Sequence, residues 1–440
     1  MAYKAQSVSL QYVQKYGPEL ERAVTRALGW SGGRLEYYAM RGTRTSYDLQ
    51  VDAYWPDATT PRAFVSVTYC RPDKPGHSNE NKLQLKLGEL LLLKARYPQI
   101  RSVLVVGGNE KTWLPYVLQA FEFFFDKTIF AWRDSFDDEI AAIAKKPDGI
   151  VLKHVDAWTT LAREWSNQRL WTEAPIRSSL RRAIWEEVSE IGREGDLPEQ
   201  ITNPIFRHCM QAAFETHKAS RGRNGKEWNS YMEEDWDGLW QSRSYFNPAE
   251  AAIELCLLAG HFAYEGGLAK DVEVPSVIHH LGGEHVDNTK VGEDFVLYSR
   301  KLSQPVLIQS KSTGGGKEDH GKNIQNRTKE QLARSLFYRG AITKSGSVVL
   351  RPKDFFWISV LDGDWGVTRR TPLKYIHMLQ WAGYDTLMPA DSLVDEDLIP
   401  LRSTENPLVR KLTELDCLTD LATFNREWAG WRNARRKTPG

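Results

Sequence analysis

Two apolar segments joined by a short polar turn constrain the fold of this chain more than any other feature. The first segment is Val291-Gly-Glu-Asp-Phe-Val-Leu-Tyr-Ser299, and the second is Pro305-Val-Leu-Ile-Gln-Ser-Lys311. Short apolar runs bounded by turn residues are typical of buried β-strands. The sequence therefore predicts a β-hairpin whose turn lies at residues 300–304.

Polar side chains gather at the open end of this hairpin. Residues two apart on a strand share a face, so Gln309 and Lys311 point together while Ser310 points away. Pairing across the hairpin brings Asp294 beside them. An acid, an oxygen donor and a lysine at one end of a sheet can hold a divalent cation and a water molecule for phosphodiester hydrolysis. A Gln-x-Lys strand also occurs in sheets without catalytic function. The flanking sequence is therefore needed to distinguish a catalytic strand from an ordinary one.

The flanking sequence supplies the other elements of a mixed α/β unit. Residues 247–262 are typical of a helix, with Asn247 as the N-cap and proline at the first helical position. A glycine-rich loop at 313–317 leads to a second helical pattern at 326–338, and an apolar strand follows at 354–361. The predicted order is helix, hairpin, strand, helix, strand.

This order, with Asp294 at the start of the hairpin and Gln309-Ser-Lys311 at its end, resembles the PD-(D/E)XK nuclease superfamily. The variant is the one in which glutamine replaces the second acid, as in Mrr-like endonucleases. The resemblance covers residues 246–366. It implies an α/β fold with a restriction-endonuclease-like mixed sheet flanked by helices. It also implies a Mg²⁺-dependent deoxyribonuclease whose partner is double-stranded DNA.

The resemblance implies a role for each polar residue of the hairpin. Asp294 would be the main metal ligand, because a carboxylate is a hard oxygen donor that suits Mg²⁺. Gln309 would donate a neutral carbonyl oxygen, and Ser310 its main-chain carbonyl. A shell with so few carboxylates favours one loosely held Mg²⁺. Lys311 would orient the attacking water and stabilise charge on the phosphorane.

Two further acids leave alternatives open. Glu293 competes with Asp294 for the ligand position, because one residue of register changes which side chain faces inwards; we favour Asp294. Glu254, on the preceding helix, is a candidate catalytic residue, as an outer-shell or water-mediated ligand. The alternative for Glu254 is an ordinary solvated glutamate.

Basic residues that could contact DNA phosphates lie in two segments. One segment is the glycine-rich loop, a candidate lid over DNA, together with the helix that follows it. The other is the polar stretch at 217–228, which is also a candidate for base readout, as are residues 71–82. The candidate DNA-binding residues are Lys317, Lys322, Arg327, Lys329, Arg334, Arg221, Arg223 and Lys226. For the loop and its helix, a solvated basic face is the alternative interpretation.

Residues 1–150 repeat the order of elements found around the hairpin. Strands at 49–55 and 63–69 precede a leucine-striped helix at 81–96 and a buried strand that starts at Arg101. This order indicates a second copy of one fold. In this copy Asp48 takes the place of Asp294.

The N-terminal copy departs from the family pattern. Ser66 and Thr68 stand where a second acid and a lysine belong. Either this copy is a degenerate, non-catalytic unit used for DNA binding or dimerisation, which we favour, or its lysine has moved to the following helix. Glu80, Lys82 and Lys86 could then supply the missing groups.

Length and composition place limits on the whole chain. A chain of 440 residues predicts two or three domains. We expect the nuclease-like unit at 1–150, a helical linker or DNA-recognition region at 151–245, the catalytic domain at 246–370 and a helical C-terminal region at 371–440. The net charge of +1 argues against a non-specific nucleic-acid coat, although it leaves room for a basic face.

The cysteines and apolar runs bear on the compartment. The 4 cysteines are widely separated and form no Cys-x-x-Cys pair, which disfavours structural zinc and a disulfide framework and fits a reducing cytoplasm. The N-terminal residues are not typical of a signal peptide, and the longest leucine run is too short to span a membrane.

Together these features predict a cytoplasmic, sequence-specific, Mg²⁺-dependent DNA endonuclease that is similar to type II restriction enzymes. One active centre per chain implies either a homodimer, which we favour, or sequential nicking of the two strands. A cognate methyltransferase acting on the same site would complete such a restriction system. The alternatives are a modification-dependent or repair nuclease, and a catalytically inactive DNA-binding or interaction protein on the same scaffold.

Overall fold

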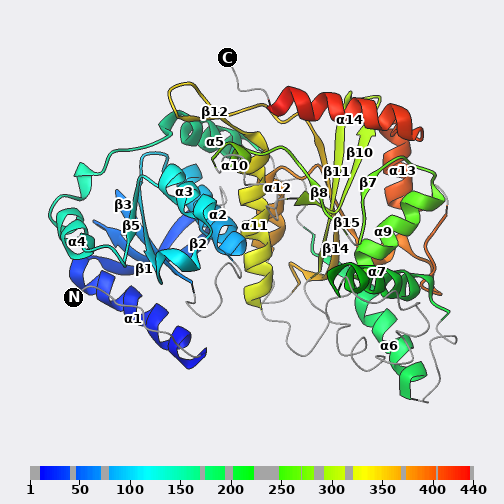
Figure 1. Ribbon diagram of the computed structural model, residues 1–440, viewed down its shortest axis with the longest axis horizontal. Helices are drawn as coiled ribbons and strands as arrows, with labels where there is room; N and C mark the ends of the chain where they lie inside the picture. Colours follow the sequence, from blue (N-terminus) through cyan, green and yellow to red (C-terminus); the bar gives the residue numbers. More distant parts are fainter. Residues whose placement is uncertain are drawn as a thin grey trace.

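A computed structural model describes residues 10–39, 46–70, 79–168, 174–193, 202–221, 247–268, 270–281, 292–312, 321–367, 373–402 and 405–436. Within these residues helices cover mixed β-sheets, which confirms the predicted α/β class. The two large sheets lie on either side of a central group of helices (Figure 1). In the described part of the chain, no helix is both long enough and apolar enough to cross a membrane.

The first sheet belongs to the N-terminal part of the chain. Its strands are β1 (Ser31–Ala39), β2 (Ser46–Trp55), β3 (Ala63–Tyr69), β4 (Arg101–Gly107) and β5 (Lys127–Phe130), in that spatial order. The pairs β1–β2 and β2–β3 are antiparallel, whereas β3–β4 and β4–β5 are parallel. The accompanying helices are α1 (Leu10–Leu28), α2 (Asn79–Arg96), α3 (Pro115–Phe124), α4 (Phe136–Lys145) and α5 (Val155–Asn167), with short 3₁₀ turns η1 (Glu110–Thr112) and η2 (Pro147–Gly149).

The second sheet is built mainly from the C-terminal part. Its order is β15 (Thr386–Pro389), β14 (Phe356–Trp365), β11 (Gln304–Ser312), β10 (Phe295–Ser299) and β7 (Glu265–Gly266), and β6 (Ile176–Ser178) also pairs with β14. The pairs β7–β10 and β10–β11 are antiparallel, whereas β11–β14 and β14–β15 are parallel. Two small antiparallel pairs are β8 (Val272–Glu273) with β9 (Gly292–Glu293) and β12 (Gly340–Ile342) with β13 (Val348–Leu350).

Helices surround this second sheet. They are α6 (Leu180–Arg193), α7 (Pro204–Arg221), α9 (Pro248–Ala259), α10 (Val277–Leu281), α11 (Gly321–Arg339), α12 (Lys374–Ala382), α13 (Pro407–Glu414) and α14 (Leu421–Arg436), with the 3₁₀ turn η6 (Ala390–Leu393). Because β6 and β15 belong to the same sheet, this unit extends beyond the expected boundaries of 246–370. Each of the two regions expected to be helical contributes one strand to it.

The two sheets share one topology. Apart from short inserted elements, the order α1-β1-β2-β3-α2-β4-α3-β5 of the first unit recurs as α9-β7-β10-β11-α11-β14-α12-β15 in the second. The antiparallel and parallel pairings also follow in the same sequence along both sheets. The similar order of elements that the sequence indicated in 1–150 and 246–366 is therefore present in three dimensions.

The equivalent helices α2 and α11 pack against each other between the sheets (Figure 1). Leu87 of α2 and Leu332 of α11 belong to the same buried core. Gly88 lies so close to the main chain of Lys329 that a Cβ atom would not fit. The two units therefore meet through the helices that follow their third strands.

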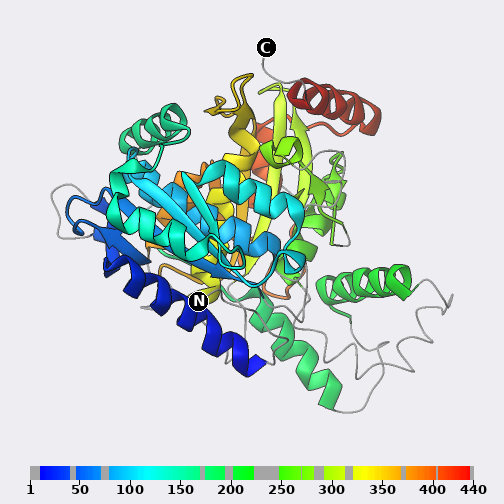
Figure 2. The ribbon, with the colours of Figure 1, turned by 60° about the vertical axis from the view of Figure 1, so that its left-hand side comes forward.

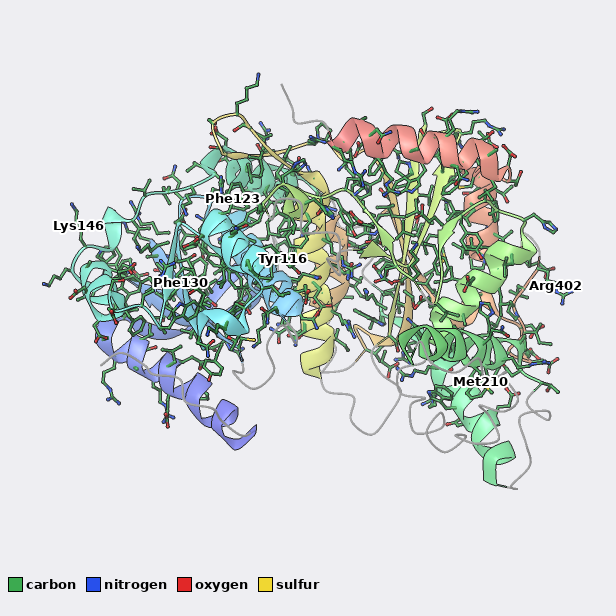
Figure 3. The ribbon with its side chains drawn as sticks, in the orientation of Figure 1. Tyr116, Phe123, Phe130, Lys146, Met210 and Arg402 are labelled. Carbon is green, nitrogen blue, oxygen red and sulfur yellow. The ribbon has the colours of Figure 1, made fainter. Side chains whose placement is uncertain are left out.

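Elements outside the helix pair complete the molecule. Helix α1 lies at the far side of the first unit from α14, as Figure 1 and the turned view in Figure 2 both show. Tyr116 of α3 reaches α2, where its hydroxyl donates a hydrogen bond to Glu80 at 2.9 Å (Figure 3). Glu80, one of the residues considered for a displaced catalytic group, is thus bound to Tyr116.

Candidate active site

Asp294 lies between β9 and β10, at the start of the predicted hairpin. Its side chain is only 6% exposed, and one carboxylate oxygen accepts a hydrogen bond from the main-chain N–H of Ser310 at 2.5 Å. The other oxygen accepts a hydrogen bond from the side-chain amide of Gln309. Pairing of Phe295 with Ile308 sets the register that places Asp294 opposite Gln309. The structure thus brings these two predicted site residues together.

Helix α11 adds a residue that the sequence assigned to another role. The guanidinium of Arg334 donates hydrogen bonds to the side-chain carbonyl of Gln309 and to the main-chain carbonyl of Gly292. The carbonyl oxygen of Gln309 therefore faces Arg334, and its amide nitrogen faces Asp294. This orientation is the reverse of the one that a metal ligand beside Asp294 requires. Arg334 is 8% exposed, so the prediction that it contacts DNA is wrong.

Lys311 follows Gln309 on the same face of β11. Its side chain is 7% exposed. Burial lowers the pKa of Lys311 to about 8, and repulsion from Arg334 acts in the same direction while the charge of Asp294 opposes it. An amine with this pKa exchanges protons near neutral pH, which suits a group that orients and polarises a water molecule.

Glu250, which the sequence analysis did not single out, also belongs to this site. It lies in the first turn of α9, where the Asn247 side chain caps the helix by accepting from its main-chain N–H at 3.4 Å. The Asn247 amide donates to the Glu250 carboxylate at 3.0 Å, and the Ser310 hydroxyl donates to the Asn247 carbonyl at 3.3 Å. Burial and, to a smaller extent, the charge of Asp294 raise the pKa of Glu250 to about 9, although Lys311 opposes the shift.

The carboxylate of Glu254 is held by partners outside the Asp294–Gln309 pair, and its predicted outer-shell role stays a prediction. It lies one helical turn after Glu250, and its carboxylate is 2.8 Å from the His208 ring nitrogen and 3.3 Å from the Tyr264 hydroxyl. Burial alone would raise the pKa of Glu254, but the hydrogen bond and charge of His208 hold it below its usual value. Glu254 ties α9 to α7 instead of facing Asp294.

Glu293, the rival of Asp294, lies in a separate pocket of polar partners. It is fully buried and accepts hydrogen bonds from the Tyr338 hydroxyl at 2.7 Å and from the Trp357 indole N–H at 2.9 Å. Arg334 lies 3.4 Å away. The structure therefore places Asp294, not Glu293, beside Gln309 and the main chain of Ser310, as we favoured from the sequence.

The remaining DNA-binding candidates divide into three groups. Lys329 is 5% exposed and pairs with Glu89 at 2.8 Å, so its predicted contact with DNA is also wrong. Arg327 is half exposed and stays a candidate. Lys322 and Arg221 lie in α11 and α7, but their side chains are outside the described residues, as are Lys317, Arg223 and Lys226 entirely.

In the N-terminal unit the acid equivalent to Asp294 is Asp52. The Asp52 carboxylate accepts a hydrogen bond from the main-chain N–H of Val67 on β3 at 2.6 Å, just as Asp294 accepts from Ser310 on β11. Asp48 is half exposed and pairs with Arg34 at 3.3 Å. The expected equivalence of Asp48 is therefore wrong by four residues.

The charges of the C-terminal site favour the binding of a divalent cation. Burial raises the pKa of both Glu250 and Asp294, and a cation between the two carboxylates would relieve their repulsion. In the residues that the structure describes, no three Asp, Glu, His or Cys side chains are arranged to hold a metal ion by themselves. A cation would therefore also need the Ser310 main-chain carbonyl and water as ligands.

Comparison of this chain with protein-family models, with curated proteins and with solved structures gave no match. The residues and their geometry are therefore the basis for a functional proposal.

Proposed function

We propose that this protein is a sequence-specific, Mg²⁺-dependent endonuclease of double-stranded DNA, similar to type II restriction enzymes and to the PD-(D/E)XK superfamily. The order α9-β7-β10-β11-α11-β14 and its pairings agree with the core that this resemblance implies. The observation that carries the proposal is the buried end of β11, where Lys311 follows Gln309 on the same face, opposite Asp294 in the hairpin, and interacts electrostatically with Asp294 and Glu250. Burying an amine and two incompletely neutralised carboxylates together costs folding free energy. Such groups are typical of active sites, where the same charges serve the hydrolytic reaction.

Each group has a role in the proposed reaction. A divalent cation held by Asp294, Glu250 and the Ser310 carbonyl would neutralise charge on the scissile phosphate. Lys311 holds the attacking water and can accept or return its proton, because its pKa is about 8. A bond forms between the water oxygen and phosphorus, the bond from phosphorus to the leaving sugar oxygen breaks, and that oxygen takes up a proton.

The Arg334–Gln309 pair positions this site. Arg334 holds Gln309, and Gln309 holds one oxygen of Asp294, so the carboxylate is fixed on the strand before any ligand binds. Fixed groups need no reorganisation during the reaction, which is how active sites stabilise charge that develops on a phosphate. Arg327 is the described residue best placed to contact the DNA backbone, because it lies on the same helix and is half exposed.

Cleavage of supercoiled plasmid DNA tests the proposal. Wild-type protein with Mg²⁺ should produce discrete linear fragments, and Lys311→Met should not, because methionine fills the buried space without an amine. The matched control is Lys301→Met, since Lys301 is exposed in the turn of the same hairpin. DNA binding should persist in Lys311→Met.

Equal cleavage by Lys311→Met and wild type would contradict the site assignment. DNA binding without cleavage by the wild-type protein would favour the inactive DNA-binding alternative. Cleavage only of methylated or damaged plasmid would favour a modification-dependent or repair nuclease. The cytoplasmic location, the homodimer and a methyltransferase partner stay predictions.

A further inference from the structure

A second group of acids with a lysine lies in the N-terminal unit, at the position that corresponds to the candidate active site. Asp52 holds the N–H of Val67 on β3 in the same way that Asp294 holds the N–H of Ser310 on β11. By this correspondence Ser66 takes the place of Gln309 and Thr68 that of Lys311. The strand itself therefore provides no lysine.

The lysine comes instead from the next helix. The amine of Lys86 on α2 donates to the Ser66 hydroxyl at 2.7 Å and lies 3.0 Å from the Glu89 carboxylate. The Ser66 hydroxyl also lies 3.2 Å from Glu89. Lys86 and Glu89 thus reach the place on β3 where the strand pattern lacks its acid and its lysine.

A third carboxylate comes from the first helix of each unit. Glu21 lies one turn before Thr25 on α1, and the Thr25 hydroxyl is 3.4 Å from the Asp52 main-chain carbonyl. The Glu21 carboxylate interacts electrostatically with Asp52 and Lys86. Glu250 of α9 interacts electrostatically with Asp294 and Lys311 in the same way. Burial raises the pKa of Glu21, and the neighbouring charge of Asp52 raises it further while Lys86 opposes the shift. The first helix and the second strand therefore each provide an acid in both units, whereas the lysine comes from β11 in the C-terminal site and from α2 in the N-terminal one.

The distribution of charge in this group is unlike that of a purely structural ion pair. Glu89 has two cationic partners, Lys86 at 3.0 Å and Lys329 of α11 at 2.8 Å. Within the described residues, Glu21 and Asp52 have no ion-pair partner within bonding distance, although burial raises the pKa of each. Both carboxylates are partly buried, and a bound cation would offset the repulsion between them.

We propose that Glu21, Asp52, Glu89 and Lys86 form a second hydrolytic site for the phosphodiester of the other DNA strand. A divalent cation would also need main-chain carbonyl oxygens and water as ligands there, because the three acids are not arranged to hold it by themselves. One chain would then contain both centres needed to cut a duplex, and the N-terminal unit would replace the second subunit of a dimer. The reaction is again hydrolysis. Water supplies the new oxygen on phosphorus, and the leaving sugar oxygen takes up a proton.

The packing of the units supports this arrangement. Glu89 binds Lys329, and Lys329 lies on the same helix as Arg334, which holds the C-terminal site. The two sites are therefore attached to the two sides of the α2–α11 pair. This inference rests on the proposed function, because it assigns the same chemistry to the second unit.

The decisive variant is Asp52→Asn, because the asparagine side-chain oxygen can still accept the hydrogen bond from Val67. Supercoiled plasmid with Mg²⁺ or Mn²⁺ is the substrate, and the ratio of nicked to linear product is the readout. Wild type should yield linear DNA. Asp52→Asn should accumulate nicked circles, with second-strand cleavage slower by about 10²-fold or more. Lys86→Met should behave in the same way, and Asp48→Asn, on the same strand but half exposed, is the matched control.

Metal binding provides a readout that does not depend on cleavage. Titration calorimetry with Mn²⁺ alone should show one binding site fewer in Asp52→Asn than in wild type or in Asp48→Asn. An Asp52→Asn protein that is folded by circular dichroism, linearises plasmid at the wild-type rate and binds as much Mn²⁺ as wild type would overturn the inference. If the wild-type protein cuts no DNA, the number of Mn²⁺ ions bound by wild type and by Asp52→Asn still tests the second site.

Asp294→Asn separates this inference from the proposed function. Nicked product from Asp294→Asn and from Asp52→Asn, with none from the double variant, supports both. Loss of all cleavage in Asp294→Asn, with normal linearisation by Asp52→Asn, refutes only the second site. Normal linearisation by Asp294→Asn together with loss of cleavage in Asp52→Asn would refute the C-terminal assignment and retain the N-terminal one.

Discussion

Replacing Glu250 by glutamine should make the metal-free protein more stable at neutral pH. The folded-state pKa of Glu250 is raised from 4.5 to about 9, by burial first and then by the charge of Asp294. At pH 7 this carboxyl is neutral in the folded protein and ionised in the unfolded chain, so folding has to take up a proton. The stability that the neutral carboxyl contributes is complete below the unfolded pKa and is lost as the pH rises towards the folded pKa.

The magnitude follows from the distance between pH 7 and the usual pKa. Each pH unit is worth about 1.4 kcal/mol, which gives a cost of about 3 kcal/mol at pH 7. Glu250 is not completely buried, and solvent screening reduces this cost to about 2 kcal/mol. Glu250→Gln, which resembles the neutral carboxyl and does not ionise, should therefore raise the free energy of unfolding by about 2 kcal/mol at pH 7 and by little near pH 4.5.

Urea unfolding followed by tryptophan fluorescence, in EDTA, at both pH values measures this difference. Glu254→Gln is the matched control, because Glu254 lies one turn later on the same helix and is stabilised by His208. It should lower the stability at pH 7, which is the opposite sign. A Glu250→Gln protein that is less stable than wild type, or equally affected at both pH values, would refute the idea that Glu250 is desolvated beside Asp294. Added Mn²⁺ should stabilise wild type more than Glu250→Gln.

Three further outcomes are expected. In gel assays, chelation by EDTA should abolish plasmid cleavage, and added Mg²⁺ or Mn²⁺ should restore it. Ca²⁺ should support DNA binding with little cleavage, and full activity in EDTA would refute the metal mechanism. Arg334→Met should lower the free energy of unfolding by about 3 kcal/mol, measured by urea titration, because it leaves buried Glu293 without its cation; an unchanged midpoint would contradict this. Gly88→Ala should cost about 1–3 kcal/mol because its Cβ would strike Lys329, whereas Gly430→Ala, in an open part of α14, should gain up to about 1 kcal/mol; equal thermal shifts would contradict the close packing of α2 and α11.

The hairpin was predictable because its signal is local. Two apolar runs joined by a short polar turn predict the hairpin, and the strand register alone brings Asp294 to Gln309. The α/β class and the similar order of elements in the two units were predictable for the same reason, since each element has its own periodic pattern. Chemistry that depends on only one strand pair can be inferred without a structure.

The partners of Gln309 could not be inferred in this way. Arg334 is 25 residues from Gln309 in the sequence, and on its helix it lies among other basic residues that are typical of a solvated face. Helix α11 packs against α2, and both Arg334 and Lys329 are buried in the fold, so each needs an acceptor, which is Gln309 for Arg334 and Glu89 for Lys329. The sequence pattern of a helix indicates that one face is basic. It does not indicate that another part of the protein covers this face.

The positions of Glu254 and Asp48 show one physical limit of prediction from sequence, the first in a helix and the second in a strand. The acids that face the sites are Glu250 and Asp52, and each lies four residues from the one expected. Residues four apart share a face on a helix and also share a face on a strand, so periodicity identifies the face equally well for both candidates. Position along the axis depends on where the element ends. The cap at Asn247 sets this position for α9, and the hydrogen bond to Val67 sets it for β2. Glu250 lies four residues before the expected helix acid, and Asp52 lies four residues after the expected strand acid. The equivalence of Asp52 with Asp294 is therefore a property of three-dimensional register that the strand pattern alone does not contain.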